Sequence, residues 1–477
     1  MTSTQADIIT KQLADMEIPV KGAADSDWTV FSSTYNLRLP VVPAAVVLPR
    51  TVQHVSDAVL CAAQHGFKVQ ARSGGHSYAS YSNGGVDGAV VVDLRYFQDV
   101  ELISDSVVRV GGGVRVGNLA CAIYDQSKRA LAHGTCAAVG VGGHFTHGGY
   151  GLSSRAWGLA MDQIVAMDVV TADGRCQYVD NSKNPDLYYA MRGAADSFGI
   201  AVNFYLETQP APESVTNWYI KICDATKSVE NAVSALQHIQ TYVHDESLID
   251  RRLGLNVSLS SDFFGIGGTY FGSRADFEDA ILPALLKGIP ENPTIEVQQV
   301  DWLTSLKLLN QGQDLHVSDN YADHSNFFAK SAIVPEPGYT KDALASFFTH
   351  LLGEGARAPV SYFIMLDLYG GADSQINNKS AGSSAFAHRD ALWVAQVYGY
   401  VGNDEPFPAE GLEFVDGLVQ SMTRHLPEHR SYENYTDPSL TREQAHEQYR
   451  GRELYNELKS LKEKLDPGNV FANPQSI

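Results

Sequence analysis

The sequence has no apolar run of the roughly 18 residues that a membrane-spanning helix needs. Its N-terminus also lacks the basic segment followed by an apolar segment that marks a secretory signal peptide. Basic residues are scarce, because 35 Lys and Arg stand against 55 Asp and Glu, for a formal net charge of −20. A surface of that charge repels nucleic-acid phosphates and anionic membranes. As written, the chain is expected to be either intracellular or the processed form of an exported protein, with neither nucleic acid nor a membrane as partner.

Cysteine is scarce as well, with five residues at scattered positions. No pair has the CxxC spacing typical of zinc sites, and an odd number cannot all pair within one chain. The sequence therefore predicts neither a disulfide framework nor a metal site.

A chain of 477 residues is too long for one hydrophobic core to organise, so two domains are expected. Glycine clusters are frequent in the first part. Beyond about residue 211 they thin out, and strands alternate with amphipathic helices.

Hydrophobic periodicity predicts regular elements in both parts. Thr51 is a suitable N-cap for the first clear amphipathic helix. Residues 442–465 predict one helix, whose apolar face carries Leu454, Leu458, Leu461 and Leu465. The other expected elements are helices at 52–65, 116–129 and 184–194, strands at 67–71, 88–94, 106–113, 198–210, 361–371 and 390–401, and a hairpin over 162–180.

Two glycine-rich stretches carry the most unusual composition. In ARSGGHSYASY (71–81), His76 follows a glycine pair, and by itself it fits a histidine in a surface turn. Residues 134–151 contain seven glycines, but their aromatic and aliphatic content argues against a disordered linker. Neither stretch is a GxGxxG dinucleotide fingerprint or a P-loop. Such permissive backbone indicates close approach to a ligand, which the composition leaves unidentified.

Five motifs in order, RSGGHSY, HGTCAAVGVGGHFTHGGYG, FAHRDALWVAQVY, YENYTDPSL and KLDPGNVF, extend over most of the chain. Together they resemble the FAD-linked oxidoreductases of the vanillyl-alcohol-oxidase (VAO/PCMH) type, in the berberine-bridge-enzyme-like branch that holds the fungal glucooligosaccharide oxidases. The resemblance implies an α+β fold with an FAD-binding domain over 1–208. A substrate domain over 209–428 would have an antiparallel sheet covered by helices, and a segment over 429–477 would return to the first domain.

The resemblance also implies an FAD held by two covalent bonds, from a histidine to the 8α-methyl group and from a cysteine to ring carbon 6. By motif position these residues are His76 and Cys136; without the motif, Cys136 fits a small buried hydrophobe. Val139 matches the small residue beside the oxygen-reactive carbon of the flavin, although a packing valine explains it nearly as well. The other residues matched to cofactor contacts are Arg72, Ser73, Gly74, Gly75, Ser77, Gly134, Thr135, Gly140, Gly142, Gly143, His144, Gly148, Gly149, Gly151, Ile200 and Val202.

Oxidation of an alcohol by hydride transfer to flavin N5 requires a base for the hydroxyl proton. The resemblance assigns this role to Tyr435, paired with Asp367; without the motif, Tyr435 fits a packed aromatic. Since the pKa of tyrosine is ordinarily ~10, the site must lower it or let the phenol share its proton with a partner. Asp367 and the flavin environment are the candidate causes.

Strand alternation places Phe363 and Met365 on the same face as Asp367. In the resembled sugar oxidases their positions carry tryptophan and glutamine, so one sugar-reading hydrogen bond is missing here. Three further residues match substrate-contacting positions: Tyr78, Gln396 and Tyr432.

Two functions therefore remain open. One is an oxidase that converts the C1 hydroxyl of an oligosaccharide to a lactone while O₂ is reduced to H₂O₂. The other is a secondary-metabolite tailoring oxidase for a more apolar or aromatic substrate. The Tyr435–Asp367 pair disfavours a third, a flavin-bearing binding protein without turnover. We expect a monomer whose partners are a small-molecule substrate and O₂; the resembled oxidases are secreted, which leaves the location open.

Overall fold

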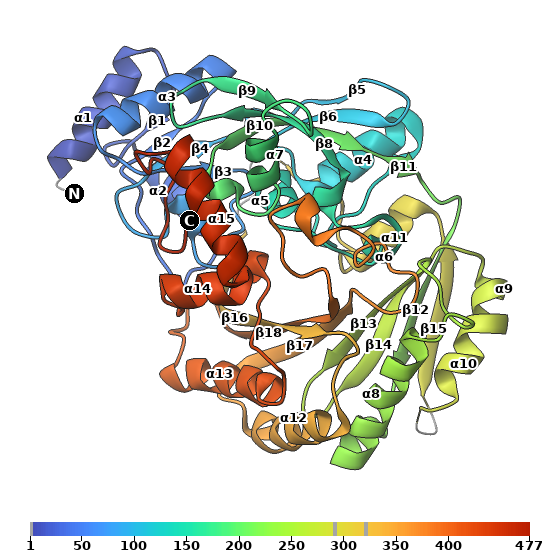
Figure 1. The fold of residues 1–477 in the computed structure, drawn as a ribbon. Coiled ribbons are helices and arrows are strands. Elements are labelled where there is room, and N and C mark those ends of the chain that lie inside the picture. The colour runs from blue at the N-terminus through green and yellow to red at the C-terminus, as the bar shows by residue number, and fades with distance from the viewer. Residues whose placement is uncertain (1–2, 290–292, 319–322) are drawn as a thin grey trace.

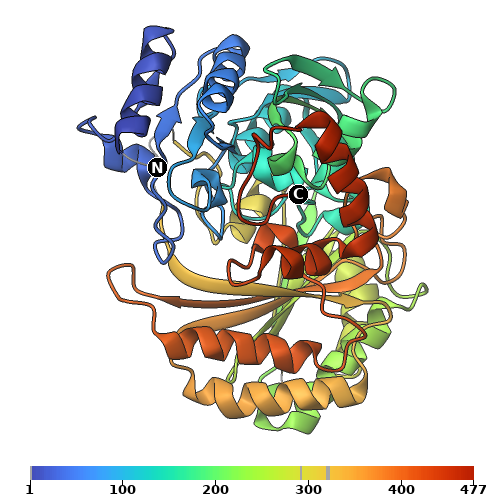
Figure 2. The same cartoon turned by 60° about the vertical axis from the view of Figure 1, so that its left-hand side comes forward.

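The fold is known from a computed structural model that describes residues 3–289, 293–318 and 323–477. The strands form three main sheets, of four, five and seven strands. In Figures 1 and 2 the seven-stranded sheet lies between the part that holds the two smaller sheets and a layer of three helices. The α+β expectation, with an antiparallel sheet covered by helices, is confirmed. Among the described residues no helix is both long and apolar enough to span a bilayer.

The four-stranded sheet has the order β1 (Val20–Lys21), β2 (Ala45–Val47), β4 (Val90–Asp93) and β3 (Val69–Arg72). Strands β2 and β3 both run parallel to β4. This arrangement needs a crossover, which α3 (Val52–Gln64) provides. The Thr51 side chain accepts a hydrogen bond from the His54 amide, so the predicted N-cap is confirmed.

The five-stranded sheet is antiparallel, in the order β5 (Val100–Leu102), β6 (Val107–Gly111), β10 (Ile200–Glu207), β8 (Ile164–Val170) and β9 (Cys176–Val179). The predicted hairpin is confirmed as β8 and β9. The helices predicted in this part are α4 (Val116–Ser127) and α7 (Pro185–Met191). The remaining short elements of the first part are α1 (Ser3–Asp15), α2 (Trp28–Ser32), β7 (Arg129–Ala130), α5 (Val141–Thr146), α6 (Ser154–Trp157) and β11 (Gln209–Pro210).

The seven-stranded sheet is antiparallel throughout. Its order is β15 (Thr294–Val300), β12 (Val215–Lys221), β14 (Phe264–Tyr270), β13 (Leu253–Leu259), β17 (Ser361–Leu368), β18 (Ala391–Val401) and β16 (Asn326–Pro335). The strands predicted from 361–371 and 390–401 are β17 and β18, both interior. Short helices α9 (Arg274–Asp276), α10 (Leu282–Leu286) and α11 (Trp302–Leu309) lie between its strands in the sequence.

One face of this sheet packs on the helical layer of α8 (Val229–Val243), α12 (Lys341–Glu354) and α13 (Ala409–Thr423). On β17 the buried side chains Ile364 and Leu366 point into that core. Their neighbours Phe363, Met365 and Asp367 alternate to the opposite face, which looks toward the first part of the chain. Packing of Ile364 and Leu366 on the helical layer therefore fixes the direction of Phe363, Met365 and Asp367.

The C-terminal stretch 442–465 forms two helices, α14 (Arg442–Tyr449) and α15 (Gly451–Leu465), so the prediction of one helix is wrong. Gly451 adopts φ +72°, a left-handed conformation that ends α14 and that only glycine takes readily. The leucine face of the second helix is confirmed, since Leu458 and Leu461 are buried in the core of the first part.

The C-terminal segment returns to the smaller sheets, as Figures 1 and 2 show for α14 and α15. The Val69 amide of β3 donates to the Val470 carbonyl at 2.9 Å. The Lys462 ammonium, buried, donates to Asp466 and to the Phe471 carbonyl, each at 2.7 Å. The domain boundaries at 208 and 428 stay a prediction.

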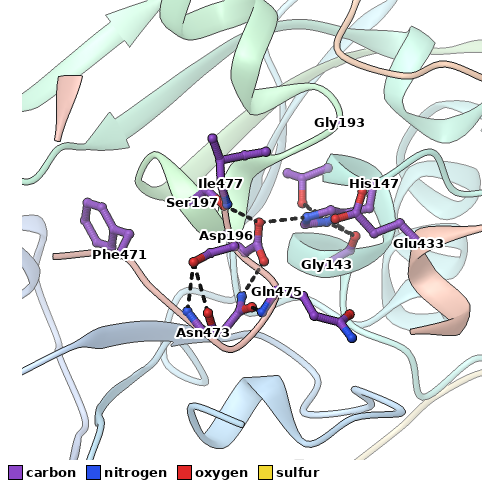
Figure 3. Close-up of polar contacts among 12 residues, drawn as sticks. Gly143, His147, Gly193, Asp196, Ser197, Glu433, Phe471, Asn473, Gln475 and Ile477 are labelled. Carbon is purple, nitrogen blue, oxygen red and sulfur yellow. Dashed lines mark hydrogen bonds and ion pairs between the residues drawn. The ribbon is translucent and has the colours of Figure 1, made fainter. Parts of the chain in front are cut away.

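A charged network completes this docking (Figure 3). The Asp196 carboxylate is 3.4 Å from His147 Nε2 and accepts a hydrogen bond from Asn473 Nδ2 at 2.6 Å. Burial alone would raise the pKa of Asp196, but the hydrogen bond and charge of His147 hold it well below its usual range. Glu433 makes an ion pair with Arg450 close by.

Ligand atoms of His147, Asp196 and Glu433 lie within 4.8 Å of one another, a spacing that a metal ion could use. Each carboxylate already has a partner within the protein, the His147 imidazole for Asp196 and the Arg450 guanidinium for Glu433. We therefore assign the cluster to docking of the C-terminal segment.

Replacement of Asp196 tests this docking contact. Asp196→Asn keeps the shape of the side chain but removes the charge that His147 and Asn473 contact, so we expect a loss of roughly 1–3 kcal/mol of unfolding free energy. Urea unfolding at neutral pH measures the loss, and hydrogen exchange of residues 469–477 should become faster.

The matched control is Asp168→Asn, because Asp168 on β8 accepts hydrogen bonds from Asn203 and Tyr205 on β10, the neighbouring central strand of the five-stranded sheet. An equal acceleration of exchange at 469–477 in both variants, or in neither, would contradict the docking role.

Candidate active site

A cavity of about 530 Å³ lies between the two glycine-rich stretches and the open face of the seven-stranded sheet. The C-terminal segment closes its third side. Most of the predicted site residues line it: Ser73, Gly74, Gly75, His76, Ser77, Tyr78, Gly134, Thr135, Cys136, Val139, Gly140, Gly143, His144, Gly151, Phe363, Met365, Asp367, Gln396, Tyr432 and Tyr435.

Six residues matched to cofactor contacts do not line the cavity: Arg72, Gly142, Gly148, Gly149, Ile200 and Val202. Arg72 is held away from it by a buried ion pair with Asp93 at 2.7 Å. The side chains of Ile200 and Val202 are fully buried in the core beneath the four-stranded sheet. Arg72, Ile200 and Val202 therefore make ion-pair and packing contacts within the protein rather than contacts with the cavity.

The two glycine-rich stretches touch each other backbone to backbone. A Cβ on Gly74 would lie 2.3 Å from the Gly140 nitrogen, and a Cβ on Gly140 would lie 2.0 Å from the Gly74 nitrogen. The Gly142 amide also donates to Ser73 Oγ at 3.1 Å. Close approach therefore requires glycine at both positions. Neither a separate surface turn nor a disordered linker describes these stretches.

This contact brings His76 and Cys136 onto one cavity wall. The His76 imidazole stacks on Tyr35, with ring centroids 4.3 Å apart. Burial, reinforced by the positive charge of Arg115, lowers the pKa of His76 to about 4, so the ring is neutral at physiological pH. Cys136 is exposed to the cavity, so the interpretation as a buried hydrophobe is wrong, while its partial desolvation raises the pKa of the thiol.

These residues fit a covalently attached flavin. A neutral imidazole and a thiol are the nucleophiles that such attachment needs, and both face the same cavity. The glycine walls leave room for a flat ring system, since a Cβ on Gly143 would meet nothing within 4 Å.

Three side chains beside this wall form a hydrogen-bonded chain. The Tyr150 hydroxyl donates to Asp367 Oδ2 at 2.9 Å and lies 2.7 Å from the Tyr435 hydroxyl. Tyr150 thus links the predicted pair of Tyr435 and Asp367. The sequence analysis did not select Tyr150, because it lies in the glycine-rich stretch among residues matched to the cofactor. Its one signal was a tyrosine between glycines in HGGYG.

The protonation states along this chain follow from burial. Desolvation raises the pKa of Asp367 to about 7, although the hydrogen bond from Tyr150 acts in the opposite direction. Burial also raises the pKa of Tyr435 well above its usual value, and the nearby charge of Asp367 raises it further. The expectation that Asp367 would lower the tyrosine pKa is therefore wrong, because a carboxylate disfavours a neighbouring phenolate. The other expectation, that the Tyr435 phenol shares its proton with a partner, remains.

The remaining predicted residues of the cavity lining combine polar and apolar side chains. Gln396 Nε2 donates to the Tyr78 hydroxyl at 2.8 Å. The Phe363 ring stacks on Tyr398, with centroids 5.1 Å apart. Asn256, opposite Asp367 in the register of β13 and β17, also lines the cavity and was not selected from the sequence.

Tyr432 is 1% exposed, and its hydroxyl is already bonded within the protein. It accepts hydrogen bonds from the Gly149 amide at 2.8 Å and from Asn434 Nδ2 at 3.0 Å. This side chain therefore braces the glycine-rich stretch against the C-terminal segment.

Comparison with known proteins gives the site its context. Residues 43–180 match the family described as FAD binding domain, and residues 431–477 match that described as berberine and berberine like. Glucooligosaccharide oxidase of Sarocladium strictum is 32% identical over 472 residues, which cover 98% of this chain and 93% of that protein. FAD-linked oxidoreductase dpmaF of Metarhizium anisopliae is 33% identical over 471 residues, 98% of this chain and 90% of that protein.

Solved structures agree with the sequence matches. Xylooligosaccharide oxidase from Myceliophthora thermophila C1, in complex with xylobiose, has a TM-score of 0.93 at 33% identity, covering 98% of both chains. Glucooligosaccharide oxidase from Acremonium strictum, whose flavin is described as 6-S-cysteinyl, 8α-N1-histidyl FAD, has a TM-score of 0.93 at 32% identity, also covering 98% of both chains. The chain therefore belongs to the FAD-dependent, berberine-bridge-enzyme-like oxidases of the VAO/PCMH type, the family of the fungal oligosaccharide oxidases.

Proposed function

We propose that this chain is an FAD oxidase with the flavin attached at His76 and Cys136, which oxidises the C1 hydroxyl of an oligosaccharide to a lactone. The observation that carries the proposal is the chain Tyr435–Tyr150–Asp367, which ends on a buried carboxylate beside the cavity wall of His76 and Cys136. The names of the relatives, glucooligosaccharide and xylooligosaccharide oxidase, support the substrate class.

When bound, FAD supplies the two-electron acceptor for the hydride and passes the electrons to O₂, which gives H₂O₂. The protein holds the flavin through His76 and Cys136 on one cavity wall, and its side chains accept the hydroxyl proton of the substrate. A double attachment fixes a ring system without a closing lid, so the cavity can stay open to a chain of sugars.

The hydroxyl proton of the substrate moves along the hydrogen-bonded chain. Tyr435 takes the proton and gives its own to Tyr150, which in turn gives its proton to Asp367. One proton arrives and one leaves at each phenol, so neither phenol has to carry a lasting charge. A carboxylate with a pKa near 7 can accept that proton at neutral pH, whereas a buried tyrosine cannot be ionised there.

The side chains matched to substrate contacts fit a carbohydrate, with Met365 as the exception. Gln396 and Tyr78 provide the polar contacts, and the Phe363 ring gives a flat surface on which a sugar face can stack. Met365, in place of the glutamine of the resembled oxidases, favours a more apolar substrate. The likeness to dpmaF, an FAD-linked oxidoreductase, keeps a tailoring oxidase for an apolar or aromatic substrate as the second candidate.

A peroxide assay with reducing disaccharides decides between these candidates. We expect H₂O₂ from at least one of cellobiose, xylobiose, chitobiose and lactose, because each carries a C1 hemiacetal hydroxyl. The matched control is the corresponding reduced sugar alcohol, which lacks that hemiacetal and should give no signal. No peroxide from any of the four at millimolar concentration would reject the oligosaccharide oxidase.

Removal of either phenol hydroxyl should break the proton chain. Tyr435→Phe and Tyr150→Phe are each expected to lower kcat by about 10²–10⁴-fold, the usual contribution of general-base catalysis. Stopped-flow reduction of the bound flavin by substrate measures the effect directly.

The control for these variants is Tyr369→Phe. Tyr369 is buried with its ring 4.9 Å from that of Tyr150, and its hydroxyl has no hydrogen-bond partner among the described residues. Its variant should keep the flavin reduction rate. An unchanged rate in Tyr150→Phe would remove Tyr150 from the proton chain.

The pH profile should report Asp367. Since the carboxylate must be ionised to accept the proton and its pKa is about 7, kcat/KM should fall about tenfold per pH unit below that value. Asp367→Asn should lower kcat/KM at pH 8 and abolish this acidic limb. A wild-type profile that stays flat down to about pH 5 would show that the terminal acceptor is another group.

A further inference from the structure

Arg115 joins the two glycine-rich stretches from behind the cavity wall. Its Nη1 donates to the Gly74 carbonyl at 3.2 Å and also to the Ala138 carbonyl. Gly74 stands two residues before His76, and Ala138 stands two residues after Cys136. One guanidinium therefore contacts both segments that carry the flavin-linking residues.

The backbone around Arg115 supports the same segment. Arg115 pairs with Gly140 in an isolated antiparallel bridge. The next two amides, of Val116 and Gly117, donate to the carbonyls of Val139 and Ala137, each at 2.9 Å. The Cys136 stretch is thus fixed to the start of α4, and the Arg115 side chain extends this attachment to the His76 stretch.

The positive charge of Arg115 acts to lower the pKa of both His76 and Cys136. A nearby cation disfavours a second positive charge on the imidazole and so lowers the pKa of His76, after the larger effect of burial. The same cation favours a thiolate at Cys136, as do the Ala138 and Val139 amides that donate to the sulfur, although burial keeps the thiol pKa raised. Asp323 opposes Arg115 at both residues.

We propose that Arg115 is the positioning residue for covalent attachment of the flavin at both His76 and Cys136. The proposal rests on the bicovalent flavin of the proposed function. Each attachment forms one C–N or C–S bond and breaks one C–H bond of the flavin and one N–H or S–H bond of the protein. The two protons and two electrons released are taken up by O₂, which becomes H₂O₂, so attachment needs no other oxidant. Arg115 contributes by holding both stretches in register, so that His76 and Cys136 face the same ligand.

The test compares Arg115→Gln, Arg115→Lys and the wild type, each purified as the full chain with excess FAD. The protein is precipitated with acid to remove flavin that is not covalently bound, and the tryptic peptides of His76 and Cys136 are examined by mass spectrometry. We expect Arg115→Gln to carry about tenfold less flavin on both peptides, with FAD still bound before precipitation. Arg115→Lys keeps the charge and should recover part of the attachment.

Three controls separate positioning from loss of folding. Arg109→Gln alters an arginine on β6 that pairs with Glu101 away from both stretches, and it should be fully flavinylated. His76→Ala and Cys136→Ala should each keep the one remaining bond, which calibrates the two peptide signals. Thermal unfolding of Arg115→Lys, which preserves a cation, shows whether a low flavin content arises in a folded chain.

Flavin on both peptides of Arg115→Gln at the wild-type level would overturn the proposal. So would a folded Arg115→Lys variant with as little attachment as Arg115→Gln, because retained charge would then have no effect. A wild-type chain without covalent flavin would instead reject the proposed function, so the two failures are distinguishable.

Discussion

The carboxylate of Asp367 lies on the face of the seven-stranded sheet that looks toward the glycine-rich stretches, and it is removed there from bulk water. Desolvation disfavours its charged form, which brings its pKa from the acidic range to about 7. The proton acceptance that we propose at neutral pH depends on this value, because the two phenols beside it are even harder to ionise. The packing of β17 on its helical layer sets this geometry, since alternation along the strand sends Asp367 to the cavity side.

A second constraint is steric. The stretches around Gly74 and Gly140 approach so closely that neither position tolerates a Cβ, and Arg115 bonds to both segments. This makes one continuous wall from two pieces of chain that are about 60 residues apart. A wall of this kind can present an imidazole and a thiol to one flat ligand without a mobile lid.

The C-terminal segment ties these parts together. Tyr435 lies in a short turn, and the neighbouring Tyr432 donates a hydrogen bond from its amide to Ser331 Oγ of β16 and braces Gly149. The same segment docks on the first part through Asp196 and Lys462. Tyr435 therefore stands at a junction that both parts of the chain hold, and its position depends on correct assembly of the whole molecule.

Local signals in the sequence were sufficient for much of the fold. The N-cap at Thr51, the β8–β9 hairpin and the interior strands β17 and β18 follow from capping chemistry and hydrophobic periodicity, which act within about 20 residues. The break at Gly451 was missed because the leucine face begins only at Leu454 and does not show where the preceding helix ends, which the backbone conformation of Gly451 does. Motif order identified His76, Cys136, Tyr435 and Asp367, and the structure brings all four to one cavity.

By itself, the sequence determined the element types, the family and the nucleophiles that face the cavity. Only the tertiary structure decided that Tyr150 links Tyr435 to Asp367, that Arg115 contacts both stretches, and that the tyrosine pKa rises. Hydrogen bonds across more than 200 residues and the loss of water around a carboxylate depend on which surfaces come together in space, and periodicity along the chain does not contain that information.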